Sequence, residues 1–86
     1  MNISKELITT KLVAVLREQL KLPYEDTSFP MEAKLIDLGL DSLGAVTLLL
    51  NVEQAFGLLF PDSMLTQETF QTAANLEKAV RTLLGS

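Results

Sequence analysis

The sequence predicts an all-α fold: a small bundle of three longer helices and one short helix, with a long first loop. Three segments place apolar residues at helical spacing, and each is bounded by residues that favour helix ends. No strand-like alternation, internal repeat or low-complexity segment interrupts this pattern. The chain has 86 residues, the length of one small domain, so we expect a single domain over residues 1–86.

The first predicted helix runs from a cap at Ser4 to about Leu20. Apolar residues recur along it at helical spacing, at Ile8, Leu12, Val15, Leu16 and Leu20. Pro23 follows closely, and a proline disfavours the helical conformation in the residue before it. The first helix is therefore expected to end just before this proline.

A long connection rich in turn-forming residues follows, from Leu22 to Leu40. A connection of this length is unusual in a small domain unless it is functional or anchored by its own side chains. We expect the anchors among its apolar residues, which are Tyr24, Phe29, Leu35, Ile36 and Leu38.

The second predicted helix, Ser42 to Phe56, carries apolar residues on two sides. With a rotation of about 100° per residue, one face collects the residues expected in the core, namely Ala45, Leu48, Leu49, Val52 and Phe56. The far side collects Leu43, Val46 and Leu50, beside Thr47 and Gln54. Since an ordinary surface helix has one apolar stripe, we interpret the far side as a partner-docking patch. The alternative is that these residues fill the core around the long loop.

Capping residues divide the rest of the chain. Gly57 suits the left-handed end of the second helix, and Leu58 and Phe60 can point inward after it. Thr66 can cap a short third helix, Gln67 to Phe70. Thr72 then caps the last helix, Ala73 to Leu84, before Gly85 ends it; its apolar stripe is Leu76, Val80, Leu83 and Leu84.

Composition excludes several kinds of chemistry. The chain has no Cys and no His, so it can form neither a disulfide, nor a zinc site of Cys and His, nor a Ser–His or Cys–His catalytic pair. No apolar run is long enough to span a bilayer. We therefore expect neither an enzyme nor a membrane protein. The N-terminus lacks the layout of a secretory signal, which indicates a cytoplasmic location.

Charge is unevenly distributed along the chain, whose net charge is −4. From Leu35 to Glu77 there is no Lys or Arg, whereas six acidic residues occur: Asp37, Asp41, Glu53, Asp62, Glu68 and Glu77. This part should attract basic partner surfaces and repel nucleic acid. The alternative is that the charge serves solubility alone.

One serine stands at the predicted start of the second helix. Asp41 is a good N-cap, which places Ser42 at the first helical position. There the free N–H groups and the helix dipole favour an anion, such as a phosphate ester on the serine hydroxyl. The simpler interpretation is that the Asp-Ser pair only begins a helix.

The motif and its surroundings resemble a known family. Residues 38–43 read LGLDSL, residues 46–57 read VTLLLNVEQAFG and residues 60–62 read FPD. Together they resemble the acyl and peptidyl carrier proteins, from Leu12 to about Val80. The resemblance implies a four-helix carrier bundle with a 4′-phosphopantetheine arm on Ser42, at a site that Asp41 helps the modifying enzyme to recognise. It also implies that partner enzymes recognise Leu43, Val46, Thr47, Leu50 and Gln54.

The resemblance predicts a discrete, monomeric carrier that is a substrate of other enzymes. A phosphopantetheinyl transferase would move the arm from coenzyme A to Ser42, and a ligase would load an acyl or aminoacyl group as a thioester. Condensing, tailoring or thioesterase enzymes of polyketide or nonribosomal-peptide biosynthesis would follow. A D-alanyl carrier and a fatty-acid carrier are alternatives, the latter less favoured because the second helix has only one acid, Glu53. A rival of another class is a helical adaptor that is never modified.

Overall fold

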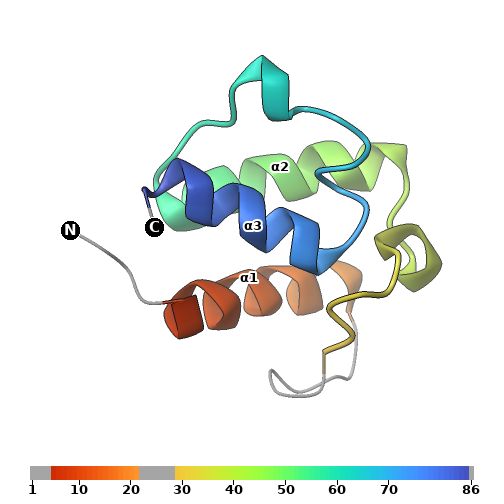
Figure 1. The fold of residues 1–86 in the computed structure, drawn as a ribbon. Helices are drawn as coiled ribbons and strands as arrows, with labels where there is room; N and C mark the ends of the chain where they lie inside the picture. Colours follow the sequence, from red (N-terminus) through yellow and green to blue (C-terminus); the bar gives the residue numbers. More distant parts are fainter. Residues whose placement is uncertain (1–4, 22–28, 86) are drawn as a thin grey trace.

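The computed structural model describes residues 5–21 and 29–85, and this part of the chain is helical (Figure 1). The α-helices are α1 (Lys5–Leu20), α2 (Ser42–Phe56) and α3 (Ala73–Leu83). Single turns of 3₁₀ helix lie between them, η2 (Leu35–Leu38) and η3 (Asp62–Met64). The predicted all-α class is confirmed. None of the helices in the described ranges is both long and apolar enough to cross a membrane.

Helix α1 packs against both α2 and α3, so it buries a wide face (Figure 1). Ile8, Leu12 and Leu16 are fully buried, as predicted. Val13 is also fully buried, although it lies outside the apolar stripe predicted for this helix. A helix packed on two neighbours buries a broader set of positions than one apolar stripe. The cap expected at Ser4 lies outside the described residues.

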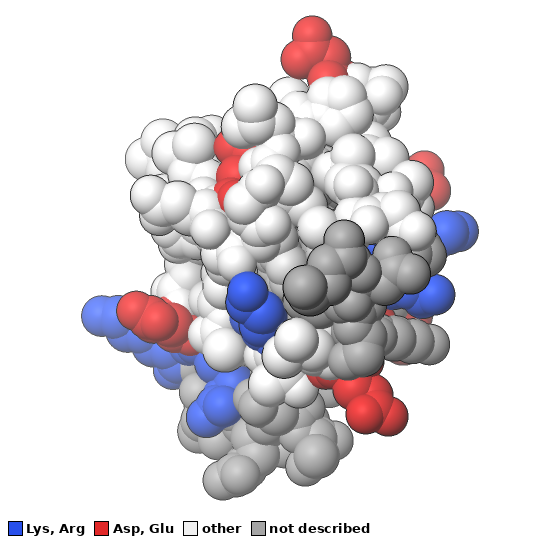
Figure 2. All heavy atoms as spheres, turned by 90° about the vertical axis from the view of Figure 1, so that its left-hand side faces the viewer, with Lys and Arg blue, Asp and Glu red and all other residues white. Residues whose placement is uncertain are grey.

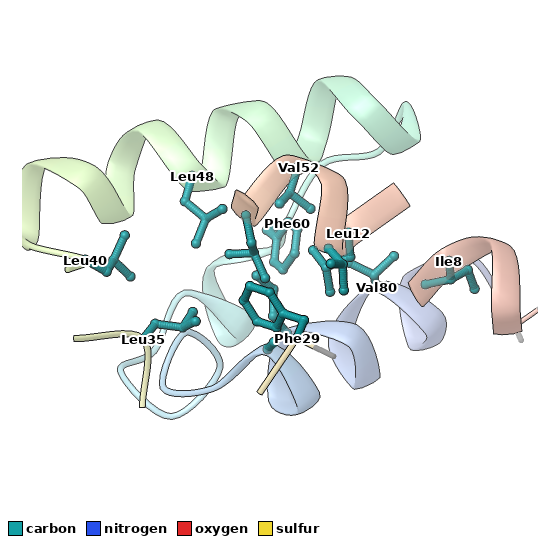
Figure 3. Packing of buried hydrophobic residues seen from close by; sticks show 13 residues of the cluster. Ile8, Leu12, Phe29, Leu35, Leu40, Leu48, Val52, Phe60 and Val80 are labelled. Atoms are coloured by element: carbon teal, nitrogen blue, oxygen red, sulfur yellow. The ribbon is translucent and has the colours of Figure 1, made fainter. Parts of the chain in front are cut away.

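The core lies where side chains from the three helices and the two connections meet (Figure 3). Leu48 and Val52 are its fully buried residues from α2, and Ala45, Leu49 and Phe56 pack against it, as predicted. Helix α3 contributes Leu76 and Val80 to the same core. The core-facing side of α2 is therefore the predicted one.

The long connection is anchored to the start of α3. Phe29 and Leu35 are buried and Leu38 packs against the core, as expected. The Leu35 N–H also donates to the carbonyl oxygen of Gln71 at 2.8 Å. Ile36 is not an anchor, since it is 71% exposed: within the 3₁₀ turn it points away from its buried neighbour Leu35. Tyr24 lies outside the described residues.

The short third helix predicted at Gln67 to Phe70 is absent: these residues form turns, and the helical turn lies earlier, in η3. Thr66 does cap its segment, because its Oγ1 accepts from the Thr69 N–H at 3.2 Å. The carbonyl oxygen of Glu68 accepts from the Asn75 side chain at 3.0 Å. Contacts with the start of α3 thus hold this segment as a turn. Phe70 still faces inward, with its ring centroid 5.8 Å from that of Phe60.

Candidate functional site

The first turn of α2 presents Ser42 to solvent. Asp41 has extended backbone angles, and its Oδ1 accepts from the Gly44 N–H at 2.6 Å. This is the predicted N-cap, and Ser42 follows as the first residue of the helix. Gly39 turns the chain from η2 toward α2 at a φ of 108°, a conformation that favours glycine. The local sequence therefore fixes both the start of the helix and the exposure of its first hydroxyl.

The outer side of α2 is exposed and apolar. Leu43 is 81% exposed, and Val46 and Leu50 are each 57% exposed. Thr47 and Gln54 are exposed beside them, and Thr47 Oγ1 donates to the carbonyl oxygen of Leu43 at 3.3 Å. These residues do not fill the core, so the alternative considered for them is wrong. We call Leu43, Val46 and Leu50 the outer patch.

A groove of about 500 Å³ opens beside Ser42. One side is formed by α2, through Ser42, Ala45, Val46 and Leu49. The other sides come from the connections before α2 and before α3, through Lys34, Ile36, Leu40, Leu65, Thr66, Gln67, Phe70 and Gln71. No pattern in the sequence indicates this groove, because its walls come from segments far apart in the chain.

Glu53, the one acidic residue on α2, is engaged within the molecule. Its Oε2 accepts from the Phe60 N–H at 2.8 Å, so the carboxylate holds the chain that follows the helix. No other charged side chain lies on α2, and the outer patch is bordered by uncharged residues of its own helix. The outer side of α2 is therefore mainly apolar and carries no charge.

Basic side chains are unevenly distributed over the described part of the molecule. In Figure 2 the Lys and Arg side chains lie in the lower and right-hand parts of the view, together with acidic side chains, whereas only acidic and uncharged side chains appear at the top. Around the start of α2, Asp37 and Asp41 are exposed, and so is Lys34, which lines the groove together with Ser42.

Curated relatives are similar in sequence to this chain over most of its length. Aminoacyl carrier protein 1 of Bradyrhizobium diazoefficiens is 42% identical over 74 residues, which cover 86% of this chain and 79% of the relative. Aminoacyl carrier protein 2 of the same organism is 32% identical over 79 residues, covering 92% of this chain and 89% of the relative. The aminoacyl carrier protein of Agrobacterium fabrum is 35% identical over 64 residues, covering 74% of this chain and 77% of the relative.

Solved structures share the fold. One similar chain comes from a crystal structure of an engineered Bradyrhizobium japonicum glycine:[carrier protein] ligase complexed with a carrier protein from Agrobacterium tumefaciens and ATP. The TM-score is 0.75 at 29% identity, covering 87% of this chain and 97% of that chain. Another comes from the B. japonicum ligase complexed with a glycylated carrier protein, with a TM-score of 0.72 at 32% identity, covering 85% of this chain and 97% of that chain.

A protein family also matches the chain directly. Residues 10–80 match the family described as "Phosphopantetheine attachment site", so the match includes α2 and the groove beside it. The chain therefore belongs to the phosphopantetheine-binding carrier proteins, which bear a covalent 4′-phosphopantetheine and serve partner enzymes as substrates rather than as catalysts.

Proposed function

We propose that the chain is an aminoacyl carrier protein whose arm is attached to the Ser42 hydroxyl. The observation that carries this proposal is the exposure of Ser42 at the capped start of α2, beside an open groove. These residues fit the arm, since a modifying enzyme can reach the hydroxyl. The arm supplies the thiol that the chain lacks, and its thioester holds the cargo.

An amino acid is the cargo that the comparisons favour. The relatives named above are aminoacyl carrier proteins, and a similar solved structure contains a glycylated carrier. A glycine-class ligase is therefore the loading partner that we propose, with a phosphopantetheinyl transferase acting before it. Downstream condensing, tailoring or thioesterase enzymes, a cytoplasmic location and a monomeric state complete the proposal.

The residues of the chain position the arm and provide the surface that partner enzymes recognise. Asp41 holds the first turn of α2 in place and so fixes where the arm begins. The outer patch, Leu43, Val46 and Leu50, with Thr47 and Gln54 beside it, is the surface on which partner enzymes dock. Because Glu53 is engaged with Phe60, this docking relies on apolar contact. That feature disfavours a fatty-acid carrier, for which we expected several acids along this helix.

Intact-mass measurement tests the attachment. The protein is incubated with coenzyme A and a broad-specificity phosphopantetheinyl transferase and then weighed. Wild type should gain one arm and Ser42→Ala none. Ser63→Ala is the control, because Ser63 is an exposed serine of η3 and its loss should leave the reaction unchanged. If wild type remains unmodified, the adaptor function is favoured instead. If Ser63→Ala fails to gain the arm, the attachment site is Ser63 and not Ser42.

A second step tests the cargo. The loaded protein is given ATP, a glycine:carrier protein ligase and glycine, and is weighed again before and after hydroxylamine, which cleaves thioesters. A glycyl mass that appears on the loaded protein and disappears with hydroxylamine is expected. If the protein is not glycylated but does gain an acyl mass when an acyl ligase replaces the glycine ligase, the chain is an acyl carrier.

A further inference from the structure

Lys34 shares the groove with Ser42. Both residues line it, and among the described residues that line the groove Lys34 is the only cation. The sequence continues from Leu35 to Glu77 without another Lys or Arg, so no cation of that stretch can take its place. The one acidic residue among the described lining residues is Asp41, whose Oδ1 is engaged by the Gly44 N–H.

The backbone of Lys34 is fixed while its side chain is exposed. Lys34 forms an isolated antiparallel bridge with Thr72, just before α3, and its carbonyl oxygen accepts from the Asp37 N–H at 3.0 Å. The side chain is exposed, and within the described residues its ammonium has no hydrogen-bond or ion-pair partner. The groove therefore contains an ammonium group on a fixed backbone position, and this group is available to bind an anion.

The arm would bring an anion to this place. A phosphodiester on Ser42 carries one negative charge and adds it near the exposed acids Asp37 and Asp41. The helix dipole at the start of α2 favours that charge, but only weakly where water screens it. A lysine in the same groove can approach the phosphate as a flexible point charge.

We propose that Lys34 is the cationic partner of the phosphodiester and that it directs the first atoms of the arm along the groove. This rests on the proposed function, in which Ser42 bears the arm. The pair is exposed to solvent, so its effect is modest and sensitive to salt. Loss of Lys34 should reduce the share of arms held at the groove by about two- to fivefold, as expected for an exposed ion pair.

Arm mobility gives a direct test. The arm is installed with ¹⁵N at its amides, and the heteronuclear NOE of the amide nearest the phosphate is measured in loaded wild type, Lys34→Ala and Lys34→Arg. This NOE should be highest in wild type, lower in Lys34→Ala and recovered in Lys34→Arg. Raising the salt should lower wild type to the level of Lys34→Ala. Lys78→Ala, which removes an exposed lysine of α3, is the control and should behave like wild type.

The outcomes separate this inference from the function on which it rests. The intact mass is checked first, and failure of wild type to accept the arm would overturn the proposed function. If the arm is present and its NOE is equal in wild type and Lys34→Ala, the role of Lys34 is wrong although the carrier function stands. An equal fall in Lys78→Ala would also overturn it, since that would reveal an effect of net charge.

Discussion

The side-chain amide of Gln19 donates a 2.6 Å hydrogen bond to the backbone carbonyl oxygen of Gly44. This bond joins the last turn of α1 to the first turn of α2, two residues after Ser42. Gln19 Oε1 also accepts from Asn51 Nδ2 at 3.4 Å. A Cβ at Gly44 would lie 3.5 Å from Gln19 Nε2 and only 3.0 Å from Asp41 Oδ1, so glycine suits this close approach. One side chain thus holds the serine-bearing turn against its neighbour.

We therefore expect Gln19→Ala to destabilise the protein. Loss of a partly buried hydrogen bond lowers the free energy of unfolding by about 1 kcal/mol. Urea denaturation followed by circular dichroism measures this quantity. Gln54→Ala is the control, because Gln54 is exposed on α2. Equal midpoints for the two variants would show that the Gln19 bond does not contribute to stability.

The cap at Asp41 makes a second prediction. Asp41→Ala leaves the Gly44 N–H without its acceptor and should lower the free energy of unfolding by about 1 kcal/mol. Asp41→Ser supplies another capping oxygen and should retain most of the stability. Asp37→Ala removes an exposed acid that caps no α-helix and is the control for charge. If Asp37→Ala costs as much as Asp41→Ala in the same urea experiment, capping is not the cause.

Glu53 gives a third prediction, about the chain after α2. Glu53→Ala removes the acceptor of the Phe60 N–H and should lower the free energy of unfolding by about 1 kcal/mol. Glu68→Ala, which removes an exposed acid, should change it little. Amide hydrogen exchange at Phe60 should also accelerate in Glu53→Ala alone. Unchanged exchange would mean that this carboxylate does not hold the segment.

The outer patch makes the fourth prediction. Val46→Asp and Leu50→Asp place a charge at positions that are each 57% exposed, so helix content and the unfolding midpoint should change little. Loading by the cognate ligase should fall by about tenfold or more, as for loss of a central interface contact. The measurement is kcat/KM of the ligase reaction, compared between each variant and the wild-type carrier, all bearing the phosphopantetheine arm.

Two variants control for that result. Leu48→Ala truncates a fully buried residue of the same helix and should cost about 2–5 kcal/mol of stability. Thr82→Asp adds a charge to an exposed position of α3 and should leave ligase loading unchanged. Unfolding of Val46→Asp would contradict the exposure of the patch. Normal loading of both Asp variants would place docking elsewhere.

Local patterns in the sequence predicted those features of the fold that are set by residues close to one another in the chain. The spacing of Leu48 and Val52 identified the core side of α2, and Asp41 and Gly57 identified its two ends. The predictions failed where distant contacts decide. Residues 67–70 form turns because this segment is hydrogen-bonded to α3, through Asn75 and Glu68, and to the first connection, through Leu35 and Gln71. Ile36 is exposed because η2 buries Leu35 instead.

By itself, the sequence determined the three α-helices, the exposed serine that begins α2 and the apolar outer side of that helix, since helical period and capping are local properties. The tertiary structure alone decided what surrounds the serine. It brought Lys34 into the same groove as Ser42, set Gln19 against Gly44 and engaged Glu53 with Phe60. Each of these contacts joins two different elements of the fold, and helical periodicity does not record which side chains of separate elements will meet.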